Sequence, residues 1–421
     1  MTTATSFPTG GASALHGAVR GARRPSARQA SLLAVAVGLA VVVAHDGTPA
    51  WQVVRVAATA LGAAAVWRAA AGASLLGIGI LAVPVGVGIG GPHVVKAGSP
   101  ALAAGGTLLL LGGVAALVLG VAGLVHRSHP LRAVLIAVAT VVACGVAVWT
   151  LAPAVAATNV PRPALGDRTP ADLGLPFEHV RFDARDGVPL SGWYIPSRTG
   201  AAVVLLHGAG STRSNVLDHA AVLARDGFGV LLYDARGHGR SAGRAMDFGW
   251  HGDDDIAGAV GLLRRRPDVD PGRIAAVGMS MGGESAIGAA ASIPGIRAVV
   301  AEGATNRVAG DKGWLSDEYG ARGAVTEWVA SITTGITDLL TEASPPRPLR
   351  DAASLAAPRP MLLIAAGDVT EEPLAARWIA GAAPASVRIW VAPDTGHTDA
   401  LRTHPDAWER RVTTFLRGAL R

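Results

Sequence analysis

Two long stretches of this 421-residue chain, residues 101–125 and 133–157, contain no charged side chain. A helix that crosses the hydrocarbon core of a bilayer needs about 20 mostly apolar residues, and both stretches reach that length. Three more apolar runs precede them, at 31–44, 51–72 and 74–95. The pattern therefore predicts an all-α transmembrane region of about five helices, within residues 31–157.

The earlier runs are less regular than the last two. The run at 31–44 is short, and the run at 51–72 contains Arg55 and Arg68, which could snorkel from the helix ends. Four spans therefore remain an alternative to five. A cleaved signal peptide would explain the basic tail and the first run, but not the four runs that follow.

The charges of the chain are distributed unevenly. Residues 1–160 hold nine basic residues and one acidic residue, whereas the remainder carries a net charge of −2. The overall charge of +6 thus reflects arginines beside apolar runs, which excludes a nucleic-acid partner and matches the positive-inside rule. With the tail at residues 1–30 in the cytoplasm of a plasma-membrane protein, five spans would place the second half outside the cytoplasm, and four would place it inside. Cys144, the single cysteine, allows no intramolecular disulfide.

The second half of the chain has ordinary polarity. Residues 158–176 are rich in Pro, Gly and polar residues and are typical of a linker. Beyond them, short β-branched runs alternate with helical patterns, which predicts an α/β domain at 177–421 with a doubly wound, mostly parallel sheet. Asp186-Gly187 between the first two runs predicts a hairpin turn. The expected strands are 179–183, 190–195, 202–206, 229–233, 273–277, 296–301, 361–365 and 387–391; the expected helices are 215–225, 253–265, 285–291, 372–380 and 405–416.

The pentapeptide G-x-S-x-G occurs twice, around Ser280 and around Ser241. A nucleophile elbow requires a strand, a tight turn and then a helix, so that the strained turn exposes the serine hydroxyl. Ser280 stands between a predicted strand and a predicted helix, whereas Ser241 lies in a loop with no helix behind it. We therefore expect Ser280 to be the nucleophile.

A serine nucleophile requires a base and an orienting acid. Downstream of Ser280, Asp368 ends a predicted strand and His397 follows another, so both belong at the carboxyl edge of the sheet, where open α/β sheets place ligands. Glu302 also ends a strand and is an alternative acid. The carboxylates of Glu371 and Glu372 are expected to be solvated charges at a helix start. His404 is expected only to cap or flank the last helix.

The oxyanion hole of such a site is made by backbone N–H groups. One donor is expected from Met281, directly after the nucleophile. The other is expected from Ala209, within the His207-Gly208-Ala209-Gly210 loop that follows the third strand. His207 itself is interpreted as structural, holding this loop by hydrogen bonds.

These motifs together resemble the α/β-hydrolase superfamily over residues 177–421. The hairpin at Asp186–Tyr194, the 207–210 loop, the Asp234–Ser241 segment, the Ser280 elbow, Asp368 and His397 are similar to the serine aminopeptidase-like and dienelactone hydrolase-like branches. The resemblance implies a Ser-His-Asp acyl-enzyme mechanism with no metal or organic cofactor. It does not identify the substrate, because this fold hosts esterases, peptidases, thioesterases and acyltransferases.

Residues 304–357 form an insertion where the plain fold needs only a short connection. They carry Trp314, Tyr319, Trp328, Ile332 and Ile336 at near-helical spacing. An ordinary packing helix and a cap over an apolar substrate pocket are both compatible with this pattern.

The sequence thus predicts a membrane-anchored serine hydrolase that cleaves ester or amide bonds. Its expected partners are the lipid bilayer and a small acyl substrate, for which location alone suggests a lipid or a cell-envelope ester. An acyltransferase using the same triad is one alternative. A catalytically inactive sensor or assembly module of a membrane complex is another.

Overall fold

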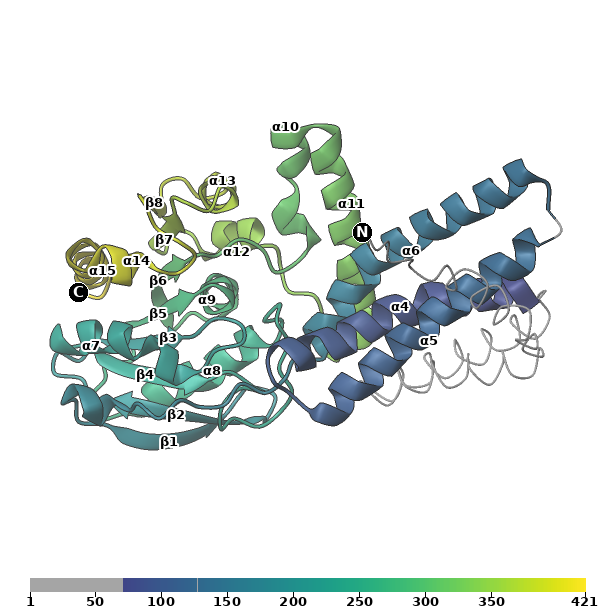
Figure 1. Ribbon diagram of the computed structural model, residues 1–421. Helices are drawn as coiled ribbons and strands as arrows, with labels where there is room; N and C mark the ends of the chain where they lie inside the picture. Colours follow the sequence, from purple (N-terminus) through teal and green to yellow (C-terminus); the bar gives the residue numbers. More distant parts are fainter. Residues whose placement is uncertain (1–70, 127) are drawn as a thin grey trace, which may run out of the picture.

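The computed structural model describes residues 71–126 and 128–421, which form a helical part and a part built on one sheet (Figure 1). The apolar run at 31–44 and nearly all of that at 51–72 lie outside the described residues. The choice between four and five spans therefore stays a prediction.

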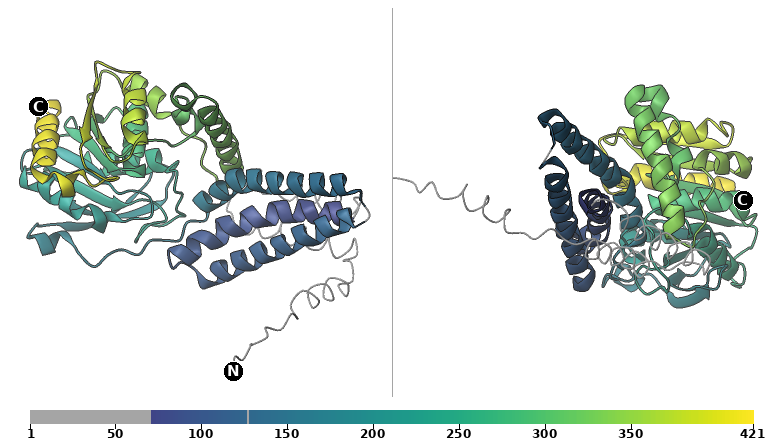
Figure 2. Two further views of the ribbon diagram at one scale, coloured as in Figure 1. Left: turned by 45° about the horizontal axis from the view of Figure 1, so that its top comes forward. Right: turned by 90° about the vertical axis from the view of Figure 1, so that its right-hand side faces the viewer.

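The helical part contains three helices long and apolar enough to cross a membrane: α4 (Ala71–Val95), α5 (Pro100–Val125) and α6 (Pro130–Thr158). They match the last three predicted runs. Helix α4 continues through Pro84, a residue that membrane helices tolerate in their interior. Helices α4 and α5 form an antiparallel pair whose connecting loop lies at the end nearest the sheet (Figure 2).

Glycines allow close approach of the backbones of α4 and α5. A Cβ atom on Gly106 would lie 2.3 Å from the backbone nitrogen of Gly90, and one on Gly86 would lie 2.5 Å from that of Leu110. Small residues at such crossings let helices gain van der Waals contact in lipid, where the hydrophobic effect between helices is lost.

The second part is an eight-stranded sheet of order β1-β2-β4-β3-β5-β6-β7-β8. Strand β2 pairs antiparallel with β1 and β4, and every other neighbouring pair is parallel. This confirms the predicted hairpin and the doubly wound α/β class. The strands are β1 (Glu178–Asp183), β2 (Pro189–Ile195), β3 (Ala202–Leu206), β4 (Gly229–Asp234), β5 (Ile274–Met279), β6 (Ile296–Glu302), β7 (Met361–Ala366) and β8 (Val387–Ala392).

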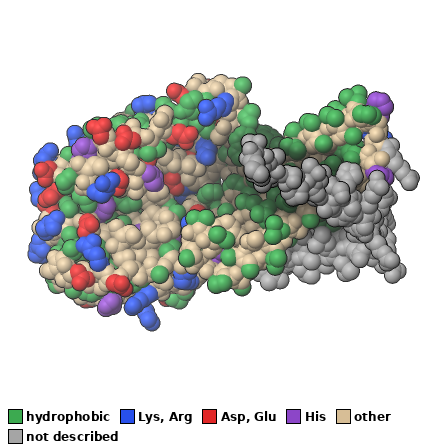
Figure 3. All heavy atoms as spheres, in the orientation of Figure 1, with side chains coloured by type: hydrophobic (Ala, Val, Ile, Leu, Met, Phe, Trp, Pro, Cys, Tyr) green, Lys and Arg blue, Asp and Glu red, His purple; other side chains and the backbone are tan. Residues whose placement is uncertain are grey.

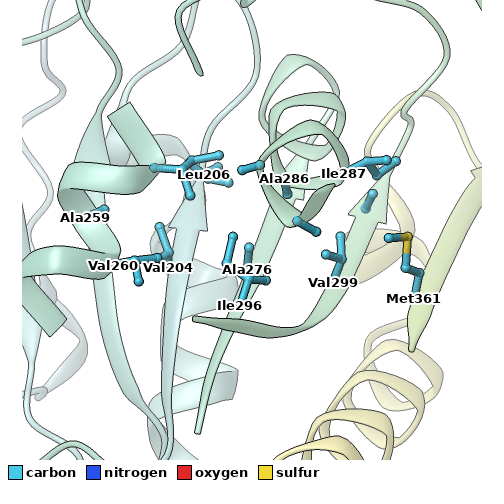
Figure 4. Packing of buried hydrophobic residues seen from close by; sticks show 14 of the residues in the cluster. Val204, Leu206, Ala259, Val260, Ala276, Ala286, Ile287, Ile296, Val299 and Met361 are labelled. Atoms are coloured by element: carbon cyan, nitrogen blue, oxygen red, sulfur yellow. The ribbon is translucent and has the colours of Figure 1, made fainter. Parts of the chain in front are cut away.

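Helices cover both faces of the sheet, because successive strand residues point to opposite sides. On one face, Val204 and Leu206 of β3 belong to a buried cluster that includes residues of α8, α9, α12 and α13; Figure 4 shows its part around β3, α8 and α9. On the other, Val203 and Leu205 belong to a second buried cluster that includes residues of α7 and α15. These helices are α7 (Leu217–Arg225), α8 (Gly252–Leu263), α9 (Met281–Ser292), α12 (Leu349–Ala356), α13 (Glu371–Ala380) and α15 (Pro405–Ala419). Short turns complete the fold: η1 (Pro170–Leu173), η2 (Arg213–Val216), η3 (Ala309–Lys312) and α14 (Ala400–Thr403).

The insertion between β6 and β7 contains α10 (Leu315–Tyr319) and α11 (Ala321–Leu340) in addition to η3 and α12. Helix α11 packs against α6: the Thr333 hydroxyl donates a hydrogen bond to the Thr150 carbonyl at 3.1 Å. Leu340 of α11 is buried in one cluster with residues of α4 and α6. The insertion therefore joins the sheet to the membrane-type helices.

A second junction lies beside the loop between α4 and α5. Lys96 of that loop forms an ion pair with Asp247 at 3.6 Å, and the Asp247 amide donates to the Ala157 carbonyl of α6 at 3.1 Å. The Lys96 ammonium also lies next to Gly210, since a Cβ atom there would be 3.3 Å from Nζ. The end of the helical part thus contacts the 207–210 loop.

The glycine contact between α4 and α5 leads to a stability prediction. Gly106→Leu should destabilise the full chain by about 1–3 kcal/mol, because the side chain has no room against Gly90. Gly105→Leu is the matched control, since nothing lies within 4 Å of a Cβ atom at that position. Thermal unfolding in detergent would measure both. Equal melting temperatures for the two variants would contradict the packing described here.

Candidate active site

Ser280 occupies a sharp turn between β5 and α9. Its backbone has φ 51° and ψ −123°, a conformation that a residue with a side chain adopts only under constraint. Its amide donates to the Glu302 carbonyl of the neighbouring strand at 2.7 Å. Positions 278 and 282 have room only for glycine. A Cβ atom on Gly278 would lie 2.3 Å from the Gly282 carbonyl carbon, and one on Gly282 would lie 2.6 Å from the His207 carbonyl oxygen. The strand, turn and helix expected around Ser280 are all present.

The other pentapeptide serine, Ser241, has a different environment. Its side chain is buried, donates to the Asp234 carbonyl at 2.5 Å and accepts from the Ser191 amide at 2.9 Å. The hydroxyl is therefore engaged in holding β2 to the loop after β4. That Ser280 and not Ser241 is the nucleophile stays a prediction.

His397 lies in the loop after β8 and is about half exposed. Its Nδ1 is 2.6 Å from Oε1 of Glu372, a carboxylate only 2% exposed. The other oxygen of Glu372 accepts from the Ala366 amide at the end of β7, at 2.7 Å. The hydrogen bond between Glu372 and the His397 ring raises the pKa of His397 above its ordinary value. A carboxylate on Nδ1 leaves Nε2 as the basic nitrogen of the neutral ring.

The carboxylate beside His397 is thus Glu372, where the sequence led us to expect Asp368. Asp368 lies exposed in the turn after β7, and within the described residues only its backbone makes a hydrogen bond, to Thr395 at 3.1 Å. The expectation that Glu372 is a solvated charge is wrong. Helix α13 starts at Glu371, so its first turn brings residue 372 back under the end of β7.

Both carboxylate oxygens of Glu302, the alternative acid, accept hydrogen bonds from groups other than His397. One carboxylate oxygen accepts from the Ala400 amide and the other from Nε1 of Trp408, each at 2.9 Å. Burial raises the pKa of Glu302. Because Ala400 is three residues beyond His397, Glu302 fixes the loop that carries the histidine.

Ser280 and His397 flank the same two residues, Glu302 and Gly303. A Cβ atom on Gly303, which has φ 69°, would lie 2.8 Å from Cε1 of His397. The Ser280 amide donates its hydrogen bond to the carbonyl of Glu302, the residue before Gly303. Within the described residues no hydrogen bond joins Ser280 Oγ to His397, and catalytic hydrogen bonds are often long in free enzymes.

The loop after β3 closes the other side of Ser280. A Cβ atom on Gly208 would lie 3.3 Å from Cβ of Ser280. His207 holds the loop: Nδ1 bonds the Gly208 carbonyl at 2.8 Å, and Nε2 accepts from the Ala235 amide at 3.0 Å. Burial lowers the pKa of His207 to about 3, so the ring is neutral and structural, as expected.

The predicted oxyanion donors border this loop. Met281 is the buried first residue of α9, and Ala209 is exposed beside Gly208. Within the described chain, neither amide donates a hydrogen bond to another protein group. Their role as a pair stays a prediction. No group of three His, Cys, Asp or Glu side chains in the described ranges is placed to hold a metal ion.

Comparison with known proteins identifies the family of the chain. The family model described as serine aminopeptidase, S33, matches residues 197–387. The uncharacterized protein Rv2307c of Mycobacterium tuberculosis H37Rv is 32% identical over 243 residues, which cover 56% of this chain and 78% of that protein.

Two further matches are a second relative, which covers a smaller part of the chain, and a solved structure. The uncharacterized protein YfhR of Escherichia coli O157:H7 is 33% identical over 156 residues, 34% of this chain and 54% of YfhR, so the chain spans about half of that relative. The esterase Pf2001 of Pyrococcus furiosus is 26% identical, with a TM-score of 0.47, over 62% of this chain and all of that structure. The family model and the Rv2307c match, together with the sheet order, show that the chain belongs to the α/β hydrolases.

Proposed function

We propose that this α/β hydrolase is a membrane-anchored serine hydrolase that cleaves ester or amide bonds through an acyl-enzyme. The observation that carries the proposal is the strained Ser280, set across Glu302 and Gly303 from the His397–Glu372 pair. Ser280 is the nucleophile, His397 the general base and Glu372 the orienting acid. Glu372 takes the role for which Asp368 was the candidate, because it alone of the two contacts the histidine.

The proposed reaction conserves protons at each step. His397 Nε2 takes the hydroxyl proton as Ser280 Oγ bonds to the acyl carbon. The amides of Met281 and Ala209 stabilise the oxyanion. Collapse breaks the bond to the alcohol or amine, which leaves with the proton from His397. Water then attacks the acyl carbon while His397 takes its proton. Collapse releases the carboxylic acid, and His397 returns the proton to Ser280 Oγ.

The membrane location rests on α4, α5 and α6 and on the arginine distribution of the N-terminal half. Charged side chains spread over the sheet-containing part, whereas hydrophobic side chains dominate the projecting end of α6 (Figure 3). We propose a plasma-membrane protein with the hydrolase domain outside the cytoplasm. The bilayer is then its first partner, and a small acyl compound its substrate.

Labelling with a fluorophosphonate, which reacts with activated serines, tests the nucleophile. Ser280→Ala should abolish labelling of the full chain, because it removes the hydroxyl proposed as the nucleophile. Ser354→Ala, an exposed serine of α12, should label like the unmodified chain. Full labelling of Ser280→Ala would contradict the proposal.

The acid is tested by comparing Glu372→Gln with Asp368→Asn. Glu372→Gln should lower kcat/KM about 10²–10⁴-fold, since the amide cannot stabilise the imidazolium or hold its tautomer. Asp368→Asn should leave kcat/KM nearly unchanged. The reverse ranking would show that Asp368 is the acid.

The pH profile adds an independent readout. The base must be neutral, so activity falls as the pH drops through the raised pKa of His397. The Glu372→Gln substitution removes the carboxylate that is the main cause of the raised pKa of His397. The acidic limb should therefore move to lower pH in this variant. If the acidic limb of the pH profile stays at the same pH in Glu372→Gln, Glu372 does not set the pKa of His397.

Alkaline phosphatase fused to the C-terminus tests the orientation. The five-span arrangement predicts an active phosphatase, because this enzyme folds only outside the cytoplasm. A fused green fluorescent protein should then remain dark. A fluorescent fusion with an inactive phosphatase would instead support four spans and a cytoplasmic hydrolase domain.

A further inference from the structure

Helix α11 exposes an uncharged, mostly apolar stripe along most of its length, and its exposed charged residue, Arg322, lies near its N-terminal end. The exposed stripe follows helical spacing and contains Ala324, Val325, Trp328, Ser331, Gly335 and Leu339. Val325 is 46% exposed, Trp328 51% and Leu339 44%. None of these side chains is charged. The opposite side of the helix is buried through residues such as Val329 and Thr333.

This surface differs from that of a helix facing water. Amphipathic helices of globular proteins turn charged and polar residues outward. Helix α15 of the same domain does so, exposing Asp406, Glu409, Arg410, Arg411 and Arg417. The contrast within one domain indicates that α11 faces a different medium.

The position of α11 identifies that medium. On α6 the exposed large apolar residues begin at Leu131 and end at Trp149, about 27 Å apart at 1.5 Å per residue. This distance is close to the roughly 30 Å of a bilayer hydrocarbon core. Thr150, the next residue, is buried and accepts the hydrogen bond from Thr333. Helix α11 therefore meets α6 where its lipid-facing surface ends.

The direction of α11 agrees with this position. The helix crosses α6 at a steep angle and does not run beside it (Figures 1 and 2). An apolar helix that crosses a span at the bilayer boundary lies along the membrane surface. Exposed Trp149 and Trp328 stand on the two crossing helices, and tryptophan is enriched at this level of membranes.

We propose that α11 is an interfacial helix whose stripe of Val325, Trp328 and Leu339 rests on the lipids of the bilayer that α6 crosses. The inference depends on the membrane anchoring proposed above and extends it to the substrate. Helix α11 belongs to the insertion that leaves the end of β6, directly after Glu302 and Gly303. The catalytic edge is therefore held beside the lipid surface, and the substrates it suits are amphiphilic esters from that surface.

Spin-label accessibility in phosphatidylcholine vesicles tests the contact. The chain has one cysteine, Cys144 in α6, so Cys144→Ala provides a cysteine-free background. In this background, a label at Trp328→Cys or Val325→Cys should collide with oxygen more than with a water-soluble nickel chelate. A label at Leu355→Cys, an equally exposed apolar position (56%) on α12, should show the reverse preference. A label on the native Cys144 marks the bilayer interior.

The outcomes separate the two proposals. If position 328 behaves like 355 while Cys144 is in lipid, the interfacial helix is excluded and the anchoring stands. If Cys144 is also accessible to the chelate, both the membrane anchoring and the interfacial helix are excluded.

Activity provides the second readout. Trp328→Glu should lower hydrolysis of a long-chain ester in vesicles about tenfold, since a carboxylate weakens contact with the bilayer. It should leave hydrolysis of a short, soluble ester unchanged, which also shows that the variant is folded. Leu355→Glu should change neither rate. Equal rates of Trp328→Glu and the unmodified chain on vesicles would overturn the proposal.

Discussion

The buried Glu302, together with Gly303, is the connection on which the candidate active site depends. Its carbonyl accepts the Ser280 amide, and its carboxylate accepts the Ala400 amide and the Trp408 indole N–H. A carboxylate buried this far from water is stable only when it is hydrogen-bonded. Three parts of the chain, the turn after β5, the loop after β8 and helix α15, are thus fixed to one residue. Of these hydrogen bonds, the one from the Ser280 amide holds the strained turn directly.

The same end of the sheet faces the helical part of the chain. Lys96 from the α4–α5 loop lies at Gly210 beside the predicted oxyanion loop, and α11 connects the end of β6 to α6. Under the proposed membrane anchoring, the chain has one surface adapted to lipid and one adapted to water, and the candidate active site lies near their boundary. The placement gives the insertion a physical task, which is to cover α6 at the level where its apolar surface ends.

Much of this arrangement could be predicted from sequence. Long uncharged runs and β-branched runs between helical patterns are local signals, and they located the described membrane-type helices and all eight strands. Ser280 was recognisable because an elbow is also local. Glu372 was missed because three carboxylates follow β7 within six residues, and only the starting point of α13 decides which of them turns inward. The packing of α11 on α6 joins residues 183 positions apart, and no local pattern carries that information.

The most direct test of this account is a cryo-electron microscopy structure of the full chain in a lipid nanodisc after reaction with a fluorophosphonate. The account predicts phosphorus bonded to Ser280 Oγ, with its oxygen about 3 Å from the amides of Met281 and Ala209. It also predicts His397 against Glu372, and α11 lying on the edge of the lipid. Phosphorus on another residue, or α11 surrounded by water away from the disc, would contradict it.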